Sequence, residues 1–157
     1  GVPEGMKIVH EGFLYKQGGL VKNWKKRWCC LYPNRLLYYD SQANAGKLKK
    51  PLGEVLIGVD SVINADILPA NGISGCPQEN ANDCCFAILP KQGGREYYFI
   101  CESRDEMLNH WMAKLKQVQQ MLVAEPANRH ASIRGPSPNS PSHEKVLEKS
   151  VYSALQE

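Results

Sequence analysis

Residues 12–32 read GFLYKQGGLVKNWKKRWCCLY and contain two short strand patterns separated by a glycine turn. Aromatic and aliphatic side chains, which favour strands, occupy both ends of this stretch, over residues 12–16 and 27–32. Gly18 and Gly19 lie between the two patterns and allow the backbone to turn sharply. The stretch therefore predicts an antiparallel hairpin whose connecting loop is strongly basic.

Similar strand patterns follow along the chain as far as residue 101, each bounded by turn-forming residues. The five further candidates are residues 36–39, 53–57, 61–63, 85–89 and 96–101. Because no helical period separates them, these segments favour an antiparallel sheet over alternating strands and helices. We therefore predict a mainly β fold, with seven antiparallel strands in a partly open barrel or sandwich.

The spacing of apolar residues changes at residue 103. Ser103, followed three residues later by Glu106, forms a capping box that predicts the start of a helix. Apolar residues then recur at steps of three and four, at Met107, Trp111, Leu115, Val118 and Leu122. We predict one helix over residues 103–122 that caps the barrel, with Trp111 in the core, and that ends before Pro126.

Composition divides the chain into a domain and its flanks. We expect residues 1–8 to be a disordered lead and residues 9–122 to form the compact domain. Residues 123–143 are rich in Pro and Ser, which predicts a disordered linker. We expect residues 144–157 to form a tail that contains at most one short helix.

Charge is distributed unevenly along the chain, although the formal net charge is only +3. Residues 12–50 contain nine Lys and Arg against one acidic residue, whereas residues 51–111 contain three bases against nine acids. A concentrated positive block of this kind implies an anionic partner more strongly than the net charge does.

Apolar runs and cysteine spacing in the sequence disfavour several classes of protein. The sequence shows neither a membrane-spanning apolar run nor a signal peptide, so we expect a soluble, cytoplasmic protein. The six cysteines include two adjacent pairs and no C-x-x-C spacing, which predicts free buried thiols and argues against a zinc site. We expect no metal and no other cofactor.

The basic residues of the hairpin predict a phosphate-binding site. Lys16 ends the first strand and faces Lys25 and Arg27, which are two residues apart and therefore share one face of the second strand. Such a cluster suits a ligand that carries several phosphates close together. Val21 and Trp24 in the same loop are candidates for contact with a lipid interface. The alternative is that these bases only solvate the hairpin.

The pattern Lys16-x8-Lys25-x-Arg27-x-Cys29, the seven strands and the helix bearing Trp111 resemble a pleckstrin homology (PH) domain over residues 9–122. Members of this family with such a basic pattern bind phosphoinositide head groups. The resemblance implies that the Lys and Arg residues of the pattern contact the 3- and 4-phosphates, joined by Tyr38.

The resemblance also suggests further contacts and a cellular role. Around the first set lie Asn23, Lys22 and one of the bases Lys47, Lys49 and Lys50, of which Lys50 is our choice. The expected role is recruitment to the plasma membrane by inner-leaflet 3-phosphoinositides, such as phosphatidylinositol 3,4,5-trisphosphate or 3,4-bisphosphate. The chain departs from the family pattern at Cys29, where an aromatic or aliphatic residue is common, and at Leu52, where 3-selective members place an Arg.

The sequence is less consistent with three other functions, namely protein binding alone, catalysis and nucleic-acid binding. A protein-binding adaptor on the same fold, with weak and unselective lipid affinity, is the main alternative. Catalysis is disfavoured because nucleophile and nucleotide-binding motifs are absent from the sequence. Nucleic-acid binding is disfavoured because the bases lack interleaved aromatic platforms. We expect a monomer, with protein partners recruited through the tail, where residues 150–155 (SVYSAL) resemble an inhibitory tyrosine motif.

Overall fold

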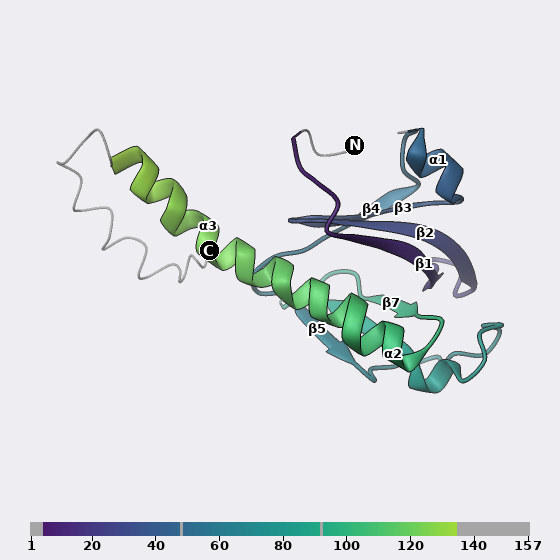
Figure 1. Ribbon diagram of the computed structural model, residues 1–157. Coiled ribbons are helices and arrows are strands. Elements are labelled where there is room, and N and C mark those ends of the chain that lie inside the picture. Colours follow the sequence, from purple (N-terminus) through teal and green to yellow (C-terminus); the bar gives the residue numbers. More distant parts are fainter. Residues whose placement is uncertain (1–4, 48, 92, 135–157) are drawn as a thin grey trace. The chain divides into compact units, whose positions relative to one another are not determined.

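The computed structural model describes residues 5–47, 49–91 and 93–134, with side chains as far as residue 124. Seven strands form one antiparallel sheet in the order β4-β3-β2-β1-β7-β6-β5, which confirms the predicted fold (Figure 1). The strands are β1 (His10–Gln17), β2 (Trp24–Tyr32), β3 (Arg35–Tyr39), β4 (Gly53–Leu56), β5 (Val62–Ala65), β6 (Cys85–Leu89) and β7 (Tyr97–Ile100). Because β4 and β5 end this order without pairing to each other, the sheet stays open between them.

The β1–β2 hairpin is the longest strand pair of the sheet and positions the basic residues. Its register runs from His10 opposite Leu31 to Gln17 opposite Trp24. The amide of Gly18 donates a hydrogen bond of 2.8 Å to the carbonyl of Asn23 and closes the loop. A side chain at Gly18 would collide with a backbone carbonyl oxygen of the same loop, which explains the glycine there.

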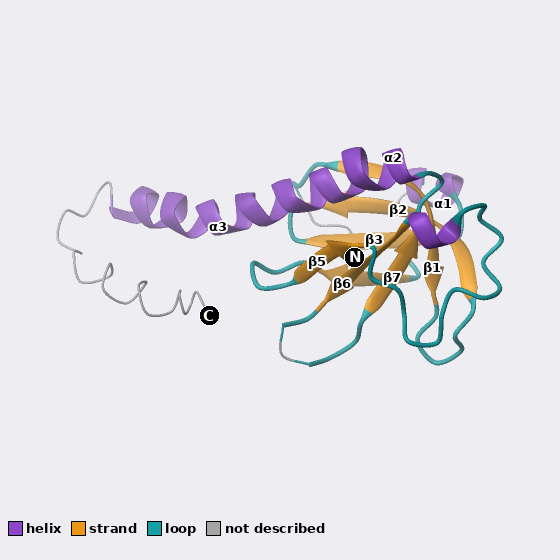
Figure 2. Cartoon of the chain, turned by 90° about the horizontal axis from the view of Figure 1, so that it is seen from below, coloured by secondary structure: helices purple, strands orange, loops and turns teal. Residues whose placement is uncertain are grey.

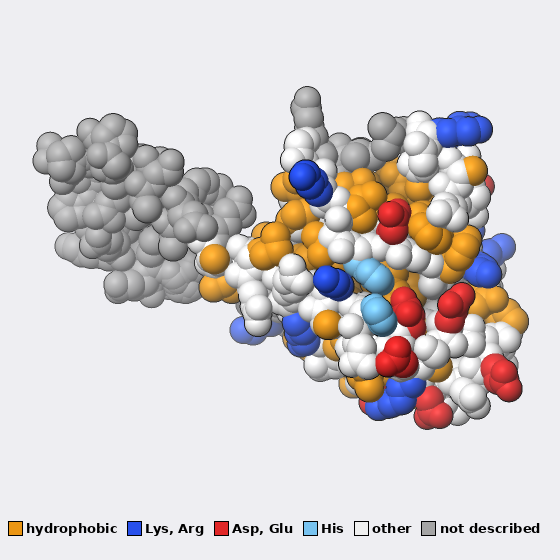
Figure 3. Space-filling model, in the orientation of Figure 1, with side chains coloured by type: hydrophobic (Ala, Val, Ile, Leu, Met, Phe, Trp, Pro, Cys, Tyr) orange, Lys and Arg blue, Asp and Glu red, His pale blue; other side chains and the backbone are white. Residues whose placement is uncertain are grey.

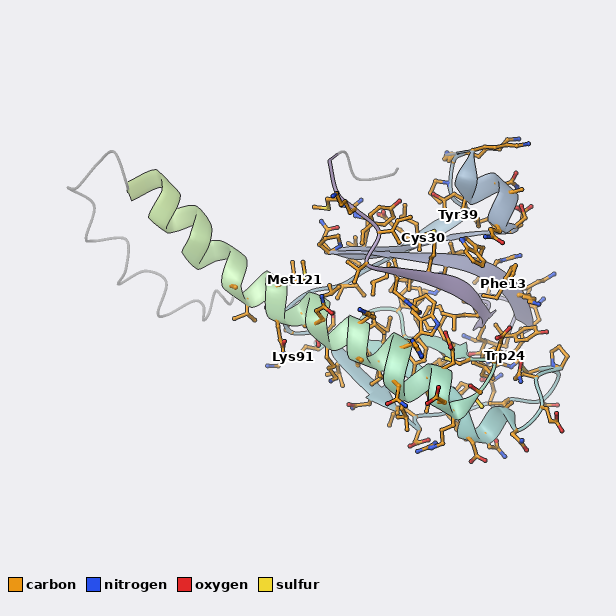
Figure 4. The ribbon with its side chains drawn as sticks, in the orientation of Figure 1. Phe13, Trp24, Cys30, Tyr39, Lys91 and Met121 are labelled. Atoms are coloured by element: carbon orange, nitrogen blue, oxygen red, sulfur yellow. The ribbon has the colours of Figure 1, made fainter. Side chains whose placement is uncertain are left out.

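Side chains of β2 alternate between two apolar clusters. Cys29 and Leu31 lie in the main core, between the sheet and the C-terminal helix. A second, smaller cluster on the opposite face contains Cys30, Tyr32, Leu37 and Tyr39. Figure 4 shows Cys30 and Tyr39 close together on this face. The adjacent cysteines therefore point away from each other, and both are free thiols.

Two short helices lie in segments for which we predicted no structure. Helix α1 (Gln42–Gly46) follows β3, and its N-terminus is capped by Ser41, whose Oγ accepts a hydrogen bond of 3.1 Å from the Asn44 amide. The 3-10 helix η1 (Ala81–Asp83) precedes β6 and buries Ala81. Both are too short to show an apolar period in the sequence.

Residues 104–122 of the C-terminal helix cover the main core along one side of the strands (Figure 2). The helix consists of α2 (Arg104–Glu106), the π-helical stretch η2 (Met107–Met112) and α3 (Ala113–Arg134). Ser103 Oγ accepts a hydrogen bond of 3.0 Å from the Glu106 amide, which confirms the predicted N-cap. Trp111 is fully buried, as predicted, and its ring packs against the bare backbone of Gly12.

The prediction that this helix ends at residue 122 was wrong. Helix α3 continues through Pro126 to Arg134, so residues 123–134 of the predicted linker are helical. The prediction rested on the helix-breaking effect of one proline, which does not end the helix in the structure. The rest of the linker, residues 135–143, and the tail, residues 144–157, lie outside the described residues.

Candidate phosphate-binding site

Lys16 lies at the centre of the candidate site. Only 5% of this residue is exposed, and its Nζ lies 4.5 Å from the ring centroid of Tyr38 and 5.6 Å from that of Tyr97. Burial, reinforced by the positive charge of Arg95, lowers the pKa of Lys16 to about 8. The ammonium group has therefore lost much of its hydration, and an anion bound here would restore a partner for the charge.

Strand β2 supplies the next two cations. Lys25 lies directly opposite Lys16 in the β1–β2 register, and Arg27 lies opposite Leu14, one step further along the same face. Lys25 is exposed and Arg27 is half-buried, with its Nη1 donating to the carbonyl of Lys26 at 3.4 Å. The structure thus places three of the basic residues predicted from the sequence together on one face of the hairpin.

Tyr38 reaches the same place from the neighbouring strand. It lies opposite Cys29 on one side and Gly53 on the other. Its ring fills the space above Gly53, where any larger residue would collide with the Tyr38 hydroxyl. Burial raises the pKa of Tyr38, so the hydroxyl stays protonated at neutral pH and can donate a hydrogen bond to a phosphate.

Arg95 is a member of this cluster that the sequence analysis missed. It precedes β7, and its guanidinium carbon lies 4.6 Å from the ring centroid of Tyr97. The guanidinium also lies against Gly19 in the β1–β2 loop. Two features of the sequence could have indicated it. Arg95 is one of only three bases in the acidic segment 51–111, and it lies between two glycines and the predicted strand over residues 96–101.

The tip of the β1–β2 loop is apolar, and of the two residues that we predicted for contact with a lipid interface, Val21 is exposed and Trp24 is not. Leu20 is 99% exposed and Val21 is 68% exposed, whereas Trp24 is only 8% exposed and belongs to the main core. Strand β2 begins at Trp24, three residues earlier than predicted, so its ring packs inside the fold and cannot contact a lipid interface in this conformation. Leu20, which we had not selected, is the more exposed apolar side chain.

The remaining candidates lie in the β1–β2 loop and in the β3–β4 connection. Lys22 lines an open depression of about 680 Å³ together with Leu20 and Arg95. Asn23 is exposed and closes the loop through its backbone. The three lysines of the β3–β4 connection are exposed, and no hydrogen bond or ion pair among the described residues joins them to Lys16; they are Lys47, Lys49 and Lys50.

Carboxylates elsewhere in the described residues pair with other bases. Arg35 pairs with Glu54 at 3.1 Å, and Arg104 pairs with Asp66 at 2.8 Å. His10 Nε2 lies 3.8 Å from Glu106, and Figure 3 shows histidine and acidic side chains side by side on that face. No ion pair in the described part of the chain includes the cations of the site, which are Lys16, Lys25, Arg27 and Arg95.

The part of the chain that the structure describes offers neither a metal site nor a membrane-spanning helix. No group of three or more His, Cys, Asp or Glu side chains in this part of the chain could hold a metal ion. None of its helices combines the length and the apolar character needed to cross a bilayer.

Comparison with known proteins places this chain in a family. A sequence model of the PH domain matches residues 8–120. Mouse Rho GTPase-activating protein 24 is 26% identical over 121 residues, which cover 73% of this chain and 14% of that protein. Human pleckstrin-2 is 31% identical over 100 residues, which cover 63% of this chain and 25% of that protein. The chain thus spans a quarter or less of the length of these two relatives.

Solved structures give the same result. The PH domain of human pleckstrin homology domain-containing protein family A member 5 is 26% identical, with a TM-score of 0.55 over 76% of this chain and 83% of that one. The C-terminal PH domain of pleckstrin, solved with an inositol pentakisphosphate, is 24% identical, with a TM-score of 0.51 over 71% of this chain and 98% of that one. PH domains are in general non-catalytic modules. With the match over residues 8–120 and the helix-capped seven-stranded sheet, this chain belongs to the PH domain family.

Proposed function

We propose that this chain binds the phosphorylated head groups of phosphoinositides and thereby brings a cytoplasmic protein to the inner leaflet of the plasma membrane. The observation that carries the proposal is the convergence of four cations at one end of the sheet without a carboxylate partner among the described residues. The two arginines offer planar pairs of donors to phosphate oxygens, and the two lysines offer point charges. The C-terminal PH domain of pleckstrin, which shares the fold, forms complexes with inositol pentakisphosphates.

The head groups that we propose carry a 3-phosphate, as in phosphatidylinositol 3,4,5-trisphosphate or 3,4-bisphosphate. By family resemblance, Lys16 and the pair Lys25 and Arg27 contact neighbouring phosphates, and the Tyr38 hydroxyl adds a neutral donor. Asn23, Lys22 and Lys50 form an outer ring of contacts. The register that sets Lys16 opposite Lys25 supports this assignment, because it brings the cations within reach of one compact ligand.

Apolar and basic groups of the β1–β2 loop would act together at the membrane. Leu20 and Val21 project from the loop tip, where they can enter the interface between lipid head groups and acyl chains. Each Lys or Arg near an anionic leaflet contributes about 1 kcal/mol. Lys22 lies beside the apolar tip and is well placed for that contribution. The loop would thus hold the domain on the membrane, and the cluster around Lys16 would bind the head group selectively.

Co-sedimentation with liposomes tests the proposal. Wild-type protein is compared with Arg27→Ala on liposomes that contain phosphatidylinositol 3,4,5-trisphosphate, and with Arg35→Ala as a control. Arg35 is already neutralised by Glu54, so its loss should leave binding nearly unchanged. We expect Arg27→Ala to lower the affinity at least tenfold, since a charged hydrogen bond contributes about 1.5–3 kcal/mol. Equal binding of wild type and Arg27→Ala would contradict the assignment.

A further inference from the structure

The connection between β5 and β6, residues 66–84, is long for a compact domain. Loops of more than about 12–15 residues usually have a function or lack order. This connection is anchored at both ends by one residue of the C-terminal helix, Arg104. The guanidinium of Arg104 pairs with Asp66 at 2.8 Å, and its Nη1 also donates to the carbonyl of Asp83 at 3.0 Å. The connection is therefore fixed on the body of the domain.

The same connection also reaches the loop end of the β1–β2 hairpin. Asn71 Oδ1 accepts a hydrogen bond of 3.2 Å from Nε2 of Gln17, a residue that is only 5% exposed. Gln17 lies opposite Trp24 in the last pair of the hairpin register, and Trp24 is buried in the main core together with Ala81 of the connection. Figure 4 shows Trp24 at this end of the hairpin. Both members of the last strand pair are thus buried, although the loop tip beside them is exposed.

These contacts bear on the cations of the site, because each member of the buried pair is next to one of them. Gln17 follows Lys16, and Trp24 precedes Lys25. The carbonyl of Gln17 also accepts a hydrogen bond of 3.4 Å from Lys16 Nζ. A hairpin end that moved would carry Lys16 and Lys25 with it. Fixing it in advance reduces the conformational freedom that is lost when a ligand binds.

We propose that the β5–β6 connection holds the hairpin in the conformation that binds the head group, and that Gln17 and Asn71 are positioning residues for the site. Both side chains act through the hydrogen bond between them and not through contact with the ligand. This inference rests on the proposed function, because it explains how the same site is held ready to bind. A change in the connection would then alter affinity without any change among the cations.

Calorimetric titration of the full chain with inositol 1,3,4,5-tetrakisphosphate tests the positioning role. Asn71→Ala removes the acceptor. Asn82→Ala is the matched control, because Asn82 is an exposed residue of the same connection whose side chain has no hydrogen bond among the described residues. We expect Asn71→Ala to lower the affinity about threefold or more, which is within the effect of one hydrogen bond, and Asn82→Ala to keep the affinity of wild type.

Amide hydrogen exchange separates a positioning role from a general loss of stability. The amide of Gly18 donates to the carbonyl of Asn23 and closes the loop, so its protection reports on the hairpin end. Asn71→Ala should speed exchange at Gly18, while the amides of the inner strand β6 keep their protection. Asn71→Asp keeps an acceptor oxygen for Gln17 and should restore protection at Gly18. Equal acceleration at Gly18 and in β6 would show a structural role only and would overturn the inference.

A double-mutant cycle tests whether the two residues act through each other. Gln17→Met nearly keeps the length of the side chain, but it cannot donate to Asn71. It should lower the affinity about as much as Asn71→Ala does, and the double variant should lose no more than either single variant. Losses that add fully would show that Gln17 and Asn71 act independently, which would overturn their shared role.

Titration of Arg27→Ala in parallel separates this inference from the function on which it rests. If Arg27→Ala weakens binding but Asn71→Ala lowers the affinity less than about threefold, the positioning role is overturned and the proposed function stands. If the wild type does not bind the tetrakisphosphate, or if Arg27→Ala binds it equally well, the proposed function fails and the inference with it. Because hydrogen exchange is measured without ligand, it shows independently whether the connection holds the hairpin.

Discussion

Lys16 holds a charge that the fold itself does little to stabilise. Its ammonium group is buried beside two tyrosine rings, and its one hydrogen bond to the described residues goes to the carbonyl of Gln17 at 3.4 Å. Burial and nearby positive charges bring its pKa down to about 8. A polyanionic ligand would reverse this effect, because a phosphate beside the ammonium favours its charged form.

The first prediction concerns the pH dependence of binding. Because the ligand favours charged Lys16, its pKa rises on binding, and the protein takes up protons around pH 8. Affinity for inositol 1,3,4,5-tetrakisphosphate should therefore fall as the pH rises from 7 to 9. Titration calorimetry in two buffers of different ionisation enthalpy measures the proton uptake directly. Lys16→Arg, which stays charged in this range, should show a flatter profile and less uptake; the same profile in both proteins would contradict the account.

At the scale of the element, two contributions to membrane binding come from the β1–β2 hairpin: insertion of the apolar loop tip and binding of the head group by the cations. Its apolar tip, Leu20, carries no charge, so Leu20→Ser, which removes the apolar side chain without adding a charge beside Lys22 and Arg95, should weaken binding to liposomes severalfold. The same variant should bind soluble inositol tetrakisphosphate within about threefold of wild type, which calorimetry measures. Val21→Thr gives a milder control at the adjacent position. Equal losses on liposomes and on the soluble head group would contradict this division of roles.

The elements differ in how well the sequence alone predicts them. The strands and the helix face of Met107 and Trp111 follow from local periodicity, and the structure confirms them. Trp24 was misplaced because an aromatic residue among lysines is equally compatible with a loop tip and with a strand end. Its burial depends on where β2 begins and on packing against residues distant in the sequence, which no local pattern encodes.

The candidate site shows the same limit. Lys16, Lys25 and Arg27 come from one hairpin, so their proximity follows from the turn between the two strands. Arg95 comes close only because β7 pairs with β1, and that pairing joins segments far apart in the chain. Periodicity indicates that both strands exist, but it does not indicate which edges meet.

At the scale of the whole molecule, Trp111 joins the helix to the sheet. It is fully buried, packs against Gly12 and lies edge-on to His10, with ring centroids 4.5 Å apart. Trp111→Ala should lower the free energy of unfolding by about 3–5 kcal/mol, as is typical of large aromatic deletions in cores. Urea denaturation measures this loss, with Leu108→Ala, a half-exposed position on the same helix, as control. A loss no larger than that of Leu108→Ala would contradict the role of Trp111.

The proposed function depends on where charge lies along the whole chain. The net charge of +3 combines a basic segment, residues 12–50, with an acidic one, residues 51–111. In the fold, bases outside the site such as Arg35 and Arg104 have acidic partners, whereas the cluster around Lys16 has none among the described residues. Binding to anionic membranes should accordingly weaken with salt, while the contacts around Lys16 supply selectivity.

The central claim is that this cluster is a selective site for polyphosphorylated inositol head groups. Calorimetric titration of the full chain with inositol 1,3,4,5-tetrakisphosphate tests it most directly, with inositol 1,4-bisphosphate as the comparison ligand. The account predicts a dissociation constant in the micromolar range or below for the tetrakisphosphate, at least tenfold weaker binding of the bisphosphate, and loss of that difference in Arg27→Ala. Millimolar binding that does not distinguish the two ligands would contradict the account and favour a protein-binding adaptor instead.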